Sequence, residues 1–294
     1  MNYKKYLPKR KKDYHKGDCG RVGIIAGSLS MLGSAILASQ AALRSGAGLV
    51  YLMTVEEAVP HINIMYPELI VLPLVSKSGV LAFESIDLIK KYHEQKRFDS
   101  LGIGPGLTTE LSIQKLIPEI MNLGGFTKLP LVLDADALNV LTLDNLKAYP
   151  HNKIVVTPHV GEFNRLYGKK SDGKGVLAKT DKSGKERIYY AAELSRKTRQ
   201  ITVLKGHGTV IADELNTLVN NTGNEGMATA GTGDVLTGVI TSFLAQGVVP
   251  FQAAALGVYL HGLAGDFARK EKTSYSLISS DLLTYLPKAF KTLC

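Results

Sequence analysis

The sequence has 294 residues, of which 45% are hydrophobic and 21% are charged, and its formal net charge is +9. This length suffices for one large domain or two small ones, and no apolar run approaches the roughly 18 residues that span a membrane. The positive charges gather in residues 4–12 and 169–185 without an interleaved aromatic motif, so they predict a solvated surface and not a nucleic-acid interface.

Strand-like and helix-like patterns alternate along the first two thirds of the chain. Residues 1–18 are basic and lack the apolar core of a signal peptide, so we expect a cytoplasmic protein. This alternation is typical of βαβ units and predicts an α/β fold, with a mostly parallel central sheet and helices on both faces. The expected strands lie at 21–27, 49–54, 69–74, 99–104, 129–135, 153–158 and 201–206, and the expected helices at 34–47, 56–65, 79–95 and 109–122.

The last third of the chain departs from this alternation. Residues 209–221 have the pattern of a hairpin at a sheet edge, and the chain after them is mostly helical. No internal repeat and no Pro/Ser-rich linker interrupts the pattern, so we expect a single domain over residues 1–294. Ligands of open α/β sheets bind beyond the carboxyl ends of the strands, so the turns after strands are the candidate functional segments.

Two of these turns are rich in glycine. The turn "AGSLSMLGSA" (26–35) combines glycines with serines, including Ser34, that suit a helix N-cap, and a simple strand-to-helix turn explains it equally well. The turn "GIGPGL" (102–107) places the rigid Pro105 between Gly104 and Gly106. A simple turn would explain one glycine in this stretch more easily than the three at positions 102, 104 and 106.

Two further turns are polar. Asp134 and Asp136 close an apolar strand, where they either bind a hydrated cation or cap the next helix. His159 and Glu162 follow Pro158 at the start of a predicted helix. Glu162 either complements the helix dipole or has a functional role, whereas His159 on a turn is harder to explain by packing.

The remaining two turns suit phosphate. In "VLKGHGTVIA" (203–212), Lys205 lies beside glycine N–H groups, although the Walker A pattern is absent and no G-x-G-x-x-G follows the first strand. In "MATAGTGDVLTGVI" (227–240), flexible residues lead to Asp234, which falls in the first turn of a predicted helix. Helix N-termini attract anions. Asp234 therefore either complements the helix dipole or acts on a hydroxyl beside a phosphate.

These motifs in this order resemble the ADP-dependent NAD(P)H-hydrate dehydratases, also called the YjeF C-terminal domain, of the ribokinase-like superfamily. The resemblance covers nearly all of residues 15–290. Related sugar and vitamin kinases often have Asn-x-x-Glu near magnesium, whereas this chain has His159-Val-Gly-Glu162, as the dehydratases do. Ser34 stands where the dehydratases often have alanine. Residues 169–185 look like an insertion, and we expect no companion epimerase domain on this chain.

The resemblance implies a hydro-lyase that repairs the S-epimer of hydrated NADH or NADPH. ADP or ATP would phosphorylate the ring hydroxyl, and elimination of phosphate would restore the reduced cofactor. It implies a homo-oligomer, such as a tetramer, that acts on small molecules. The charge and apolar patterns described above predict neither a nucleic-acid nor a membrane partner. The alternatives are a ribokinase-like kinase for a thiazole, pyrimidine or sugar alcohol, and a non-catalytic nucleotide- or nucleic-acid-binding protein.

The resemblance also implies roles for individual residues. Asp234 would be the catalytic base, and Glu162 would orient Mg²⁺ through water. The substrate would contact Ser34, Ala35, Gly106, His159 and Asp234. The nucleotide would contact Lys205, Gly206, His207, Gly208, Thr209, Gly231, Thr232 and Gly233.

Overall fold

The computed structural model describes residues 2–123, 129–149, 153–168, 175–177 and 184–294. Most of the lysine-rich segment 169–185 lies outside these ranges. One nine-stranded sheet has the order β11-β10-β9-β8-β7-β6-β1-β2-β3. Its strands are β1 (Arg21–Ile25), β2 (Leu49–Val55), β3 (Ile70–Leu74), β6 (Ser100–Ile103), β7 (Leu131–Leu133), β8 (Ile154–Val156), β9 (Ile201–Leu204), β10 (Val210–Ala212) and β11 (Thr217–Val219).

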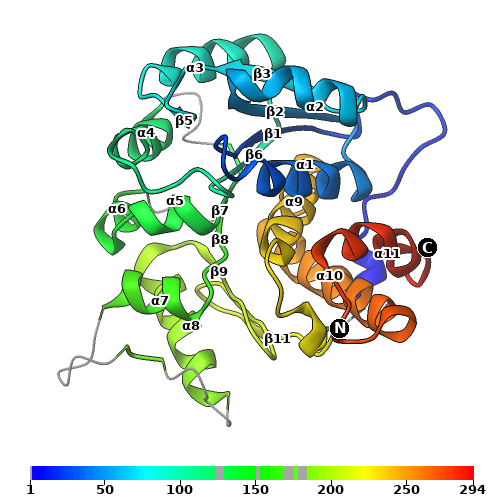
Figure 1. Cartoon of the computed structure of the whole chain (residues 1–294). Coiled ribbons are helices and arrows are strands. Elements are labelled where there is room, and N and C mark those ends of the chain that lie inside the picture. Colours follow the sequence, from blue (N-terminus) through cyan, green and yellow to red (C-terminus); the bar gives the residue numbers. More distant parts are fainter. Residues whose placement is uncertain (1, 124–128, 150–152, 169–174, 178–183) are drawn as a thin grey trace.

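The described helices lie on both sides of this sheet (Figure 1). They are α1 (Leu32–Arg44), α2 (Val59–Met65), α3 (Ser85–Lys96), α4 (Leu111–Asn122), α5 (Ala135–Val140), α6 (Leu143–Ala148), α7 (Val160–Tyr167), α8 (Lys185–Thr198), α9 (Thr232–Ala245), α10 (Pro250–Lys272) and α11 (Ser279–Lys291). Short 3₁₀ turns are η1 (Tyr3–Tyr6), η2 (Glu56–Ala58) and η3 (Glu225–Met227).

The predicted α/β fold is confirmed. Every pairing from β3 across to β9 is parallel, and in this sheet only β10 runs against the other strands, so it pairs antiparallel with β9 and with β11 and forms the predicted edge hairpin. The chain moves outward from β1 through β2 to β3, then returns to β6 on the other side of β1. The strand order therefore reverses between β1 and β6, where a ligand crevice is expected.

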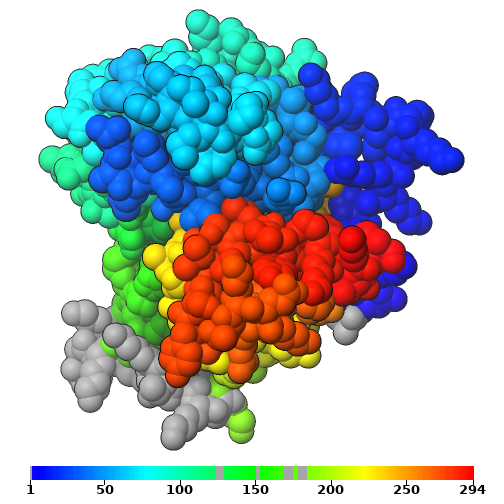
Figure 2. Space-filling model, turned by 45° about the vertical axis from the view of Figure 1, so that its right-hand side comes forward, coloured from blue at the N-terminus to red at the C-terminus, as the bar shows by residue number. Residues whose placement is uncertain are grey.

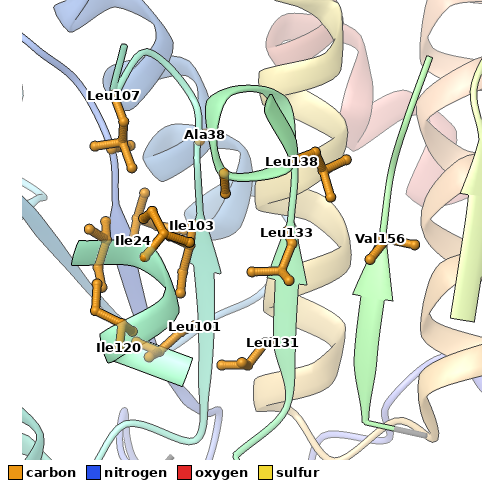
Figure 3. Close-up of a cluster of buried hydrophobic side chains, with 14 of the residues drawn as sticks. Ile24, Ala38, Leu101, Ile103, Leu107, Ile120, Leu131, Leu133, Leu138 and Val156 are labelled. Atoms are coloured by element: carbon orange, nitrogen blue, oxygen red, sulfur yellow. The ribbon is translucent and has the colours of Figure 1, made fainter. Parts of the chain in front are cut away.

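Side chains of successive strand residues point to opposite faces and build two cores. Val132 and Val155 pack with α9, α10 and α11, whereas their neighbours Leu131, Leu133 and Val156 belong to the core on the other face. Figure 3 shows this second core, in which side chains of β6 and β7 meet those of α4 and α5. Both faces of the central strands are thus buried, as their nearly continuous apolar runs predict.

Two local predictions were wrong. The expected helix 79–95 begins only at Ser85, because β4 (Ser76–Lys77) and β5 (Val80–Leu81) form a small hairpin before it. Ser78 and Gly79 both have positive φ, which suits a two-residue hairpin turn. The expected serine N-cap of the first helix is also absent: Met31 takes that position without a side-chain hydrogen bond, and Ser34 lies inside α1.

Close packing of α1 against α9 sets the position of the GTGD segment. A Cβ on Gly238 would lie 2.0 Å from the carbonyl oxygen of Ala38, so only glycine allows this approach. The C-terminal helices continue this layer, and Figure 2 shows them, orange to red, directly below the blue-to-cyan N-terminal part. Among the described residues, no helix combines the length and apolarity that a membrane crossing requires.

Candidate active site

The carboxyl ends of the parallel strands bring distant polar residues together. Asp134 follows β7 and is buried, and its Oδ1 lies 2.6 Å from Nζ of Lys205, which follows β9. Thr237 of α9 donates a 2.7 Å hydrogen bond to Oδ2 of the same carboxylate. Both oxygens of Asp134 are therefore engaged by groups from different elements. Capping of α5 by the Asp134 side chain, one of the two predicted roles, is not observed.

Lys205 lies at the centre of this cluster. Its Nζ is also 3.9 Å from Oε2 of Glu162, and a Cβ on Gly233 would lie 3.2 Å from Nζ. Burial lowers the pKa of Lys205, but the carboxylates of Asp134 and Glu162 outweigh burial, so the net pKa is raised. Lys205 is therefore a fixed cation beside the GTGD segment, and its ammonium group extends to the cluster rather than along the 205–209 turn.

Asp234 lies in the first turn of α9, as predicted. Burial raises its pKa to about 6, although a hydrogen bond from the Ser34 hydroxyl lowers it in part. A carboxylate with a pKa near 6 is still ionised at neutral pH and is a stronger base than a solvent-exposed aspartate. Ser34, the residue that departs from the family pattern, is thus close enough to the candidate base to lower its pKa.

The segment before Asp234 has the geometry of an anion-binding helix terminus. Gly231 is the N-cap of α9 with a φ of 88°, and a Cβ there would lie 2.6 Å from Leu37. Thr232 and Gly233 then open the helix, where the first N–H groups have no partner within the helix itself. These donors and the positive end of the helix dipole favour a bound phosphate.

A cavity of about 690 Å³ lies beside this segment. It is bounded by the whole predicted turn Lys205–Thr209 on one side and by Thr232 and Gly233 on another. Further walls come from residues 220–228 and from α10. The structure therefore brings the two predicted phosphate turns to the same cavity, whose size suits a nucleotide.

His159 and Glu162 form the start of α7. Nδ1 of His159 accepts a hydrogen bond from the N–H of Glu162, and Oε2 of Glu162 accepts one from the N–H of His159. This reciprocal pair is a capping box. Burial lowers the pKa of His159 and raises that of Glu162 to about 7. The histidine thus has a capping role that the sequence did not predict, and 59% of its side chain remains exposed.

The other predicted substrate contacts differ in accessibility. Gly106 has a φ of 67°, and a Cβ there would lie 3.1 Å from Cβ of Ser34, so the two residues are neighbours. Ala35 is fully buried against Gly27. Its side chain offers no surface to a ligand in this structure.

The donor set suits a magnesium ion held mainly by nucleotide phosphates and water. Within the described ranges, no three His, Cys, Asp or Glu side chains converge in a way that could hold a metal ion. Glu162 and Asp134 are oxygen donors of the kind Mg²⁺ prefers, but both already face Lys205. Contact of Glu162 with such an ion through water is compatible with this geometry.

Sequence reasoning missed three groups that shape the site. Thr237 lies one turn after Asp234, and only the fold places it against Asp134. Arg187 of α8 donates to the carbonyl oxygen of Leu204, which precedes the predicted nucleotide turn, and to that of His207 within the turn. His261 lies within the long helix α10, where no turn or glycine signal marks it.

Comparison with known proteins gives the family. A model of the family described as NAD(P)H-hydrate dehydratase matches residues 22–288. The chain belongs to this family. The ADP-dependent (S)-NAD(P)H-hydrate dehydratase of Bacillus subtilis is 32% identical over 288 residues, which cover 97% of this chain and 94% of the relative.

Longer relatives share the same region. The bifunctional NAD(P)H-hydrate repair enzyme of Moorella thermoacetica is 38% identical over 291 residues, covering 98% of this chain and 52% of the relative. The chain thus spans about half the length of that curated relative.

Solved structures show the ribokinase-like fold. The Bacillus subtilis ADP/ATP-dependent NAD(P)H-hydrate dehydratase, co-crystallised with ATP and Mg²⁺, has a TM-score of 0.80 and 31% identity, covering 99% of this chain and 96% of that one. A hydroxyethylthiazole kinase from Pyrococcus horikoshii has a TM-score of 0.62 at 16% identity, covering 94% and 92% of the two chains. The second likeness shows the fold alone.

Proposed function

We propose that this protein dehydrates the S-epimer of hydrated NADH or NADPH at the expense of ADP or ATP, and so restores the reduced cofactor. Membership of the family supports this reaction, and the site supplies a candidate base and a helix N-terminus that can bind phosphate. The observation that carries the proposal is the position of Asp234. It is a half-buried carboxylate of raised pKa in the first turn of α9, directly after Gly233, which lines the nucleotide-sized cavity.

The chemistry follows from the positions of these groups. The nucleotide lies along the turn from Lys205 to Thr209, with its terminal phosphate at the start of α9. Asp234 accepts the proton of the ring hydroxyl as the hydroxyl oxygen attacks that phosphorus and the bond to the remaining nucleotide breaks. The N–H groups of Gly231 to Gly233 and the Lys205 ammonium stabilise the charge on the transferring phosphoryl group. Departure of inorganic phosphate, together with loss of a proton from the adjacent ring carbon, then forms the ring double bond and completes the dehydration.

In the proposal, Ser34, Gly106 and His159 contact the hydrated cofactor. Ser34 lies near Asp234 and beside Gly106, and His159 pairs through its backbone with Lys205 at the start of the nucleotide turn. Mg²⁺, when bound, neutralises charge on the nucleotide phosphates. Glu162 orients that ion through water, which requires the ionised form of its carboxyl group.

We also propose that residues 1–294 form one domain, because strands from residue 21 to residue 219 share one sheet. Large apolar side chains of α2, which packs against the edge strand β3, support assembly into a homo-oligomer such as a tetramer, since Ile64 and Met65 are 83% and 66% exposed. A cytoplasmic location suits a repair enzyme for nicotinamide cofactors. Sedimentation analysis tests the assembly.

Incubation with hydrated NADH, Mg²⁺ and each nucleotide tests the reaction. We expect recovery of the absorbance of reduced nicotinamide, together with one inorganic phosphate per cofactor restored. A stable phosphoester of the cofactor without restored absorbance, or a phosphoester of a thiazole, pyrimidine or sugar alcohol supplied in a parallel incubation, would instead indicate a kinase. Nucleotide binding without any turnover would contradict the enzymatic proposal.

A further inference from the structure

Helix α10 contributes a buried polar side chain to the wall of the nucleotide cavity. His261 is only 8% exposed, and its Nε2 lies 2.9 Å from the carbonyl oxygen of Thr232. Because a carbonyl oxygen only accepts hydrogen bonds, Nε2 has the proton and donates it. Burial lowers the pKa of His261 to about 4, so the ring is neutral at neutral pH.

Thr232 is restrained through two of its groups. Its hydroxyl contacts the carbonyl oxygens of Met227 and Thr229, each at 3.1 Å. Its own carbonyl oxygen receives the hydrogen bond from His261. The start of α9 is therefore tied to the 227–229 turn on one side and to α10 on the other.

The peptide bond between Thr232 and Gly233 gives this restraint a consequence for ligand binding. In a planar trans peptide the carbonyl of one residue and the N–H of the next point in opposite directions, so fixing the carbonyl also fixes the N–H. A hydrogen bond to the carbonyl polarises the peptide and strengthens that N–H as a donor. We propose that His261 is a positioning residue that aims the Gly233 N–H at the terminal phosphate of the bound nucleotide.

The packing of α10 supports this role. A Cβ on Gly262 would lie 2.3 Å from Oγ1 of Thr222, and one on Gly265 would lie 2.2 Å from Sδ of Met227. The backbone of α10 therefore lies directly against the cavity wall formed by residues 222–227. This close approach fixes where His261 lies along α10 relative to the carbonyl oxygen of Thr232.

The inference rests on the proposed function and predicts a selective effect on phosphate recognition. ADP places its terminal phosphate at the start of α9, whereas AMP has no group that reaches this point. His261→Leu removes the donor and should weaken ADP binding about fivefold, which is the effect of one hydrogen bond. AMP affinity should stay within about twofold. Turnover should fall about tenfold, because a displaced donor stabilises the transferring group less well.

Calorimetric titration with ADP and AMP is the direct measurement. His261→Gln has an N–H at a similar reach and should restore most of the ADP affinity. If the Leu variant fails to fold, His261→Asn replaces it, because its shorter amide does not reach the Thr232 carbonyl. Leu256→Ala is the matched control: it empties a buried position of α10 outside the cavity and should lower stability without changing the ratio of ADP to AMP affinity.

Equal weakening of ADP and AMP in the Leu variant would overturn the proposal, because it would indicate a general structural effect. A Gln variant no better than Leu would do the same. The titrations need no turnover, so they decide the role of His261 even if the wild-type protein does not dehydrate hydrated NADH.

Discussion

Asp134 and Lys205, 71 positions apart in the sequence, form an ion pair of 2.6 Å at the carboxyl edge of the sheet. The side chain of Asp134 is 1% exposed and that of Lys205 is 19% exposed, so neither group is well solvated. Each is costly to bury alone. The pair therefore couples the stability of this sheet edge to the position of a cation beside the GTGD segment.

The first prediction is that Asp134→Asn destabilises the protein by about 3 kcal/mol, because it leaves the Lys205 ammonium without its main partner. Denaturant unfolding measures the loss. The double variant with Lys205→Met removes both charges and should regain much of the stability while turnover stays low. If the double variant were less stable than the single one, the two side chains would not act as a pair.

The second prediction concerns the base. Asp234→Asn keeps the shape of the side chain but cannot accept the hydroxyl proton, so turnover should fall by about 10² to 10⁴. ADP affinity should be kept or rise slightly, because the loop N–H groups remain and a nearby negative charge is gone. Single-turnover kinetics and a binding titration on one sample separate the two effects. Turnover within about threefold of wild type would exclude Asp234 as the base.

The third prediction is a pH dependence. Glu162, with its pKa near 7, and Asp234, with its pKa near 6, must both be ionised in the proposal, so kcat/KM should begin to fall below pH 7 and should fall more steeply below pH 6. Ser34→Ala removes a hydrogen bond that lowers the pKa of Asp234, so the steeper part of the acidic limb should move to higher pH. Ser30→Ala is the control, since the Ser30 hydroxyl contacts Ser28 in the same turn. An unshifted limb in the Ser34 variant would mean that another group sets the profile.

Local patterns predicted the elements of the site, but not their contacts. The apolar spacing after Asp234 correctly placed this residue in the first turn of a helix, because 3.6-residue periodicity is a local property. The glycines around Lys205 marked its turn, whereas the direction of its ammonium group depends on which strands are neighbours in the sheet. His261 has no local signal at all, since its contact exists only through the packing of α10 on α9.

The fold class could be predicted from the alternation of strand and helix patterns. The prediction of individual elements failed where the elements are short. The β4–β5 hairpin has two residues in each strand, too few for a period of two to stand out against the following helix. The capping box of His159 was missed because histidine is not among the usual N-cap residues, although Glu162 occupies the expected third position.

The fourth prediction tests the nucleotide turn. Gly206 has a φ of 144°, and a Cβ there would lie 2.9 Å from the Arg187 guanidinium, so Gly206→Val strains the turn and displaces its support. ADP affinity should fall at least tenfold. Gly247→Val is the matched control, because its φ is also positive and a Cβ there meets nothing within 4 Å. Unchanged calorimetric affinity in the folded Gly206 variant would place the nucleotide elsewhere.

The fifth prediction separates the two roles of His159, which caps α7 and, in the proposal, contacts the hydrated cofactor. His159→Ala loses the cap and should cost about 1 kcal/mol of stability. For a chain of this size that lowers Tm by about 2 °C. His159→Asn retains an N-cap acceptor, so its Tm should stay close to that of the wild type. Both variants lose the imidazole, so KM for hydrated NADH should rise in both while ADP affinity is unchanged. Calorimetry and steady-state kinetics on the three proteins check this pattern. An Asn variant with wild-type KM would show that His159 serves α7 alone, and the substrate contact would then have to come from Ser34 and Gly106.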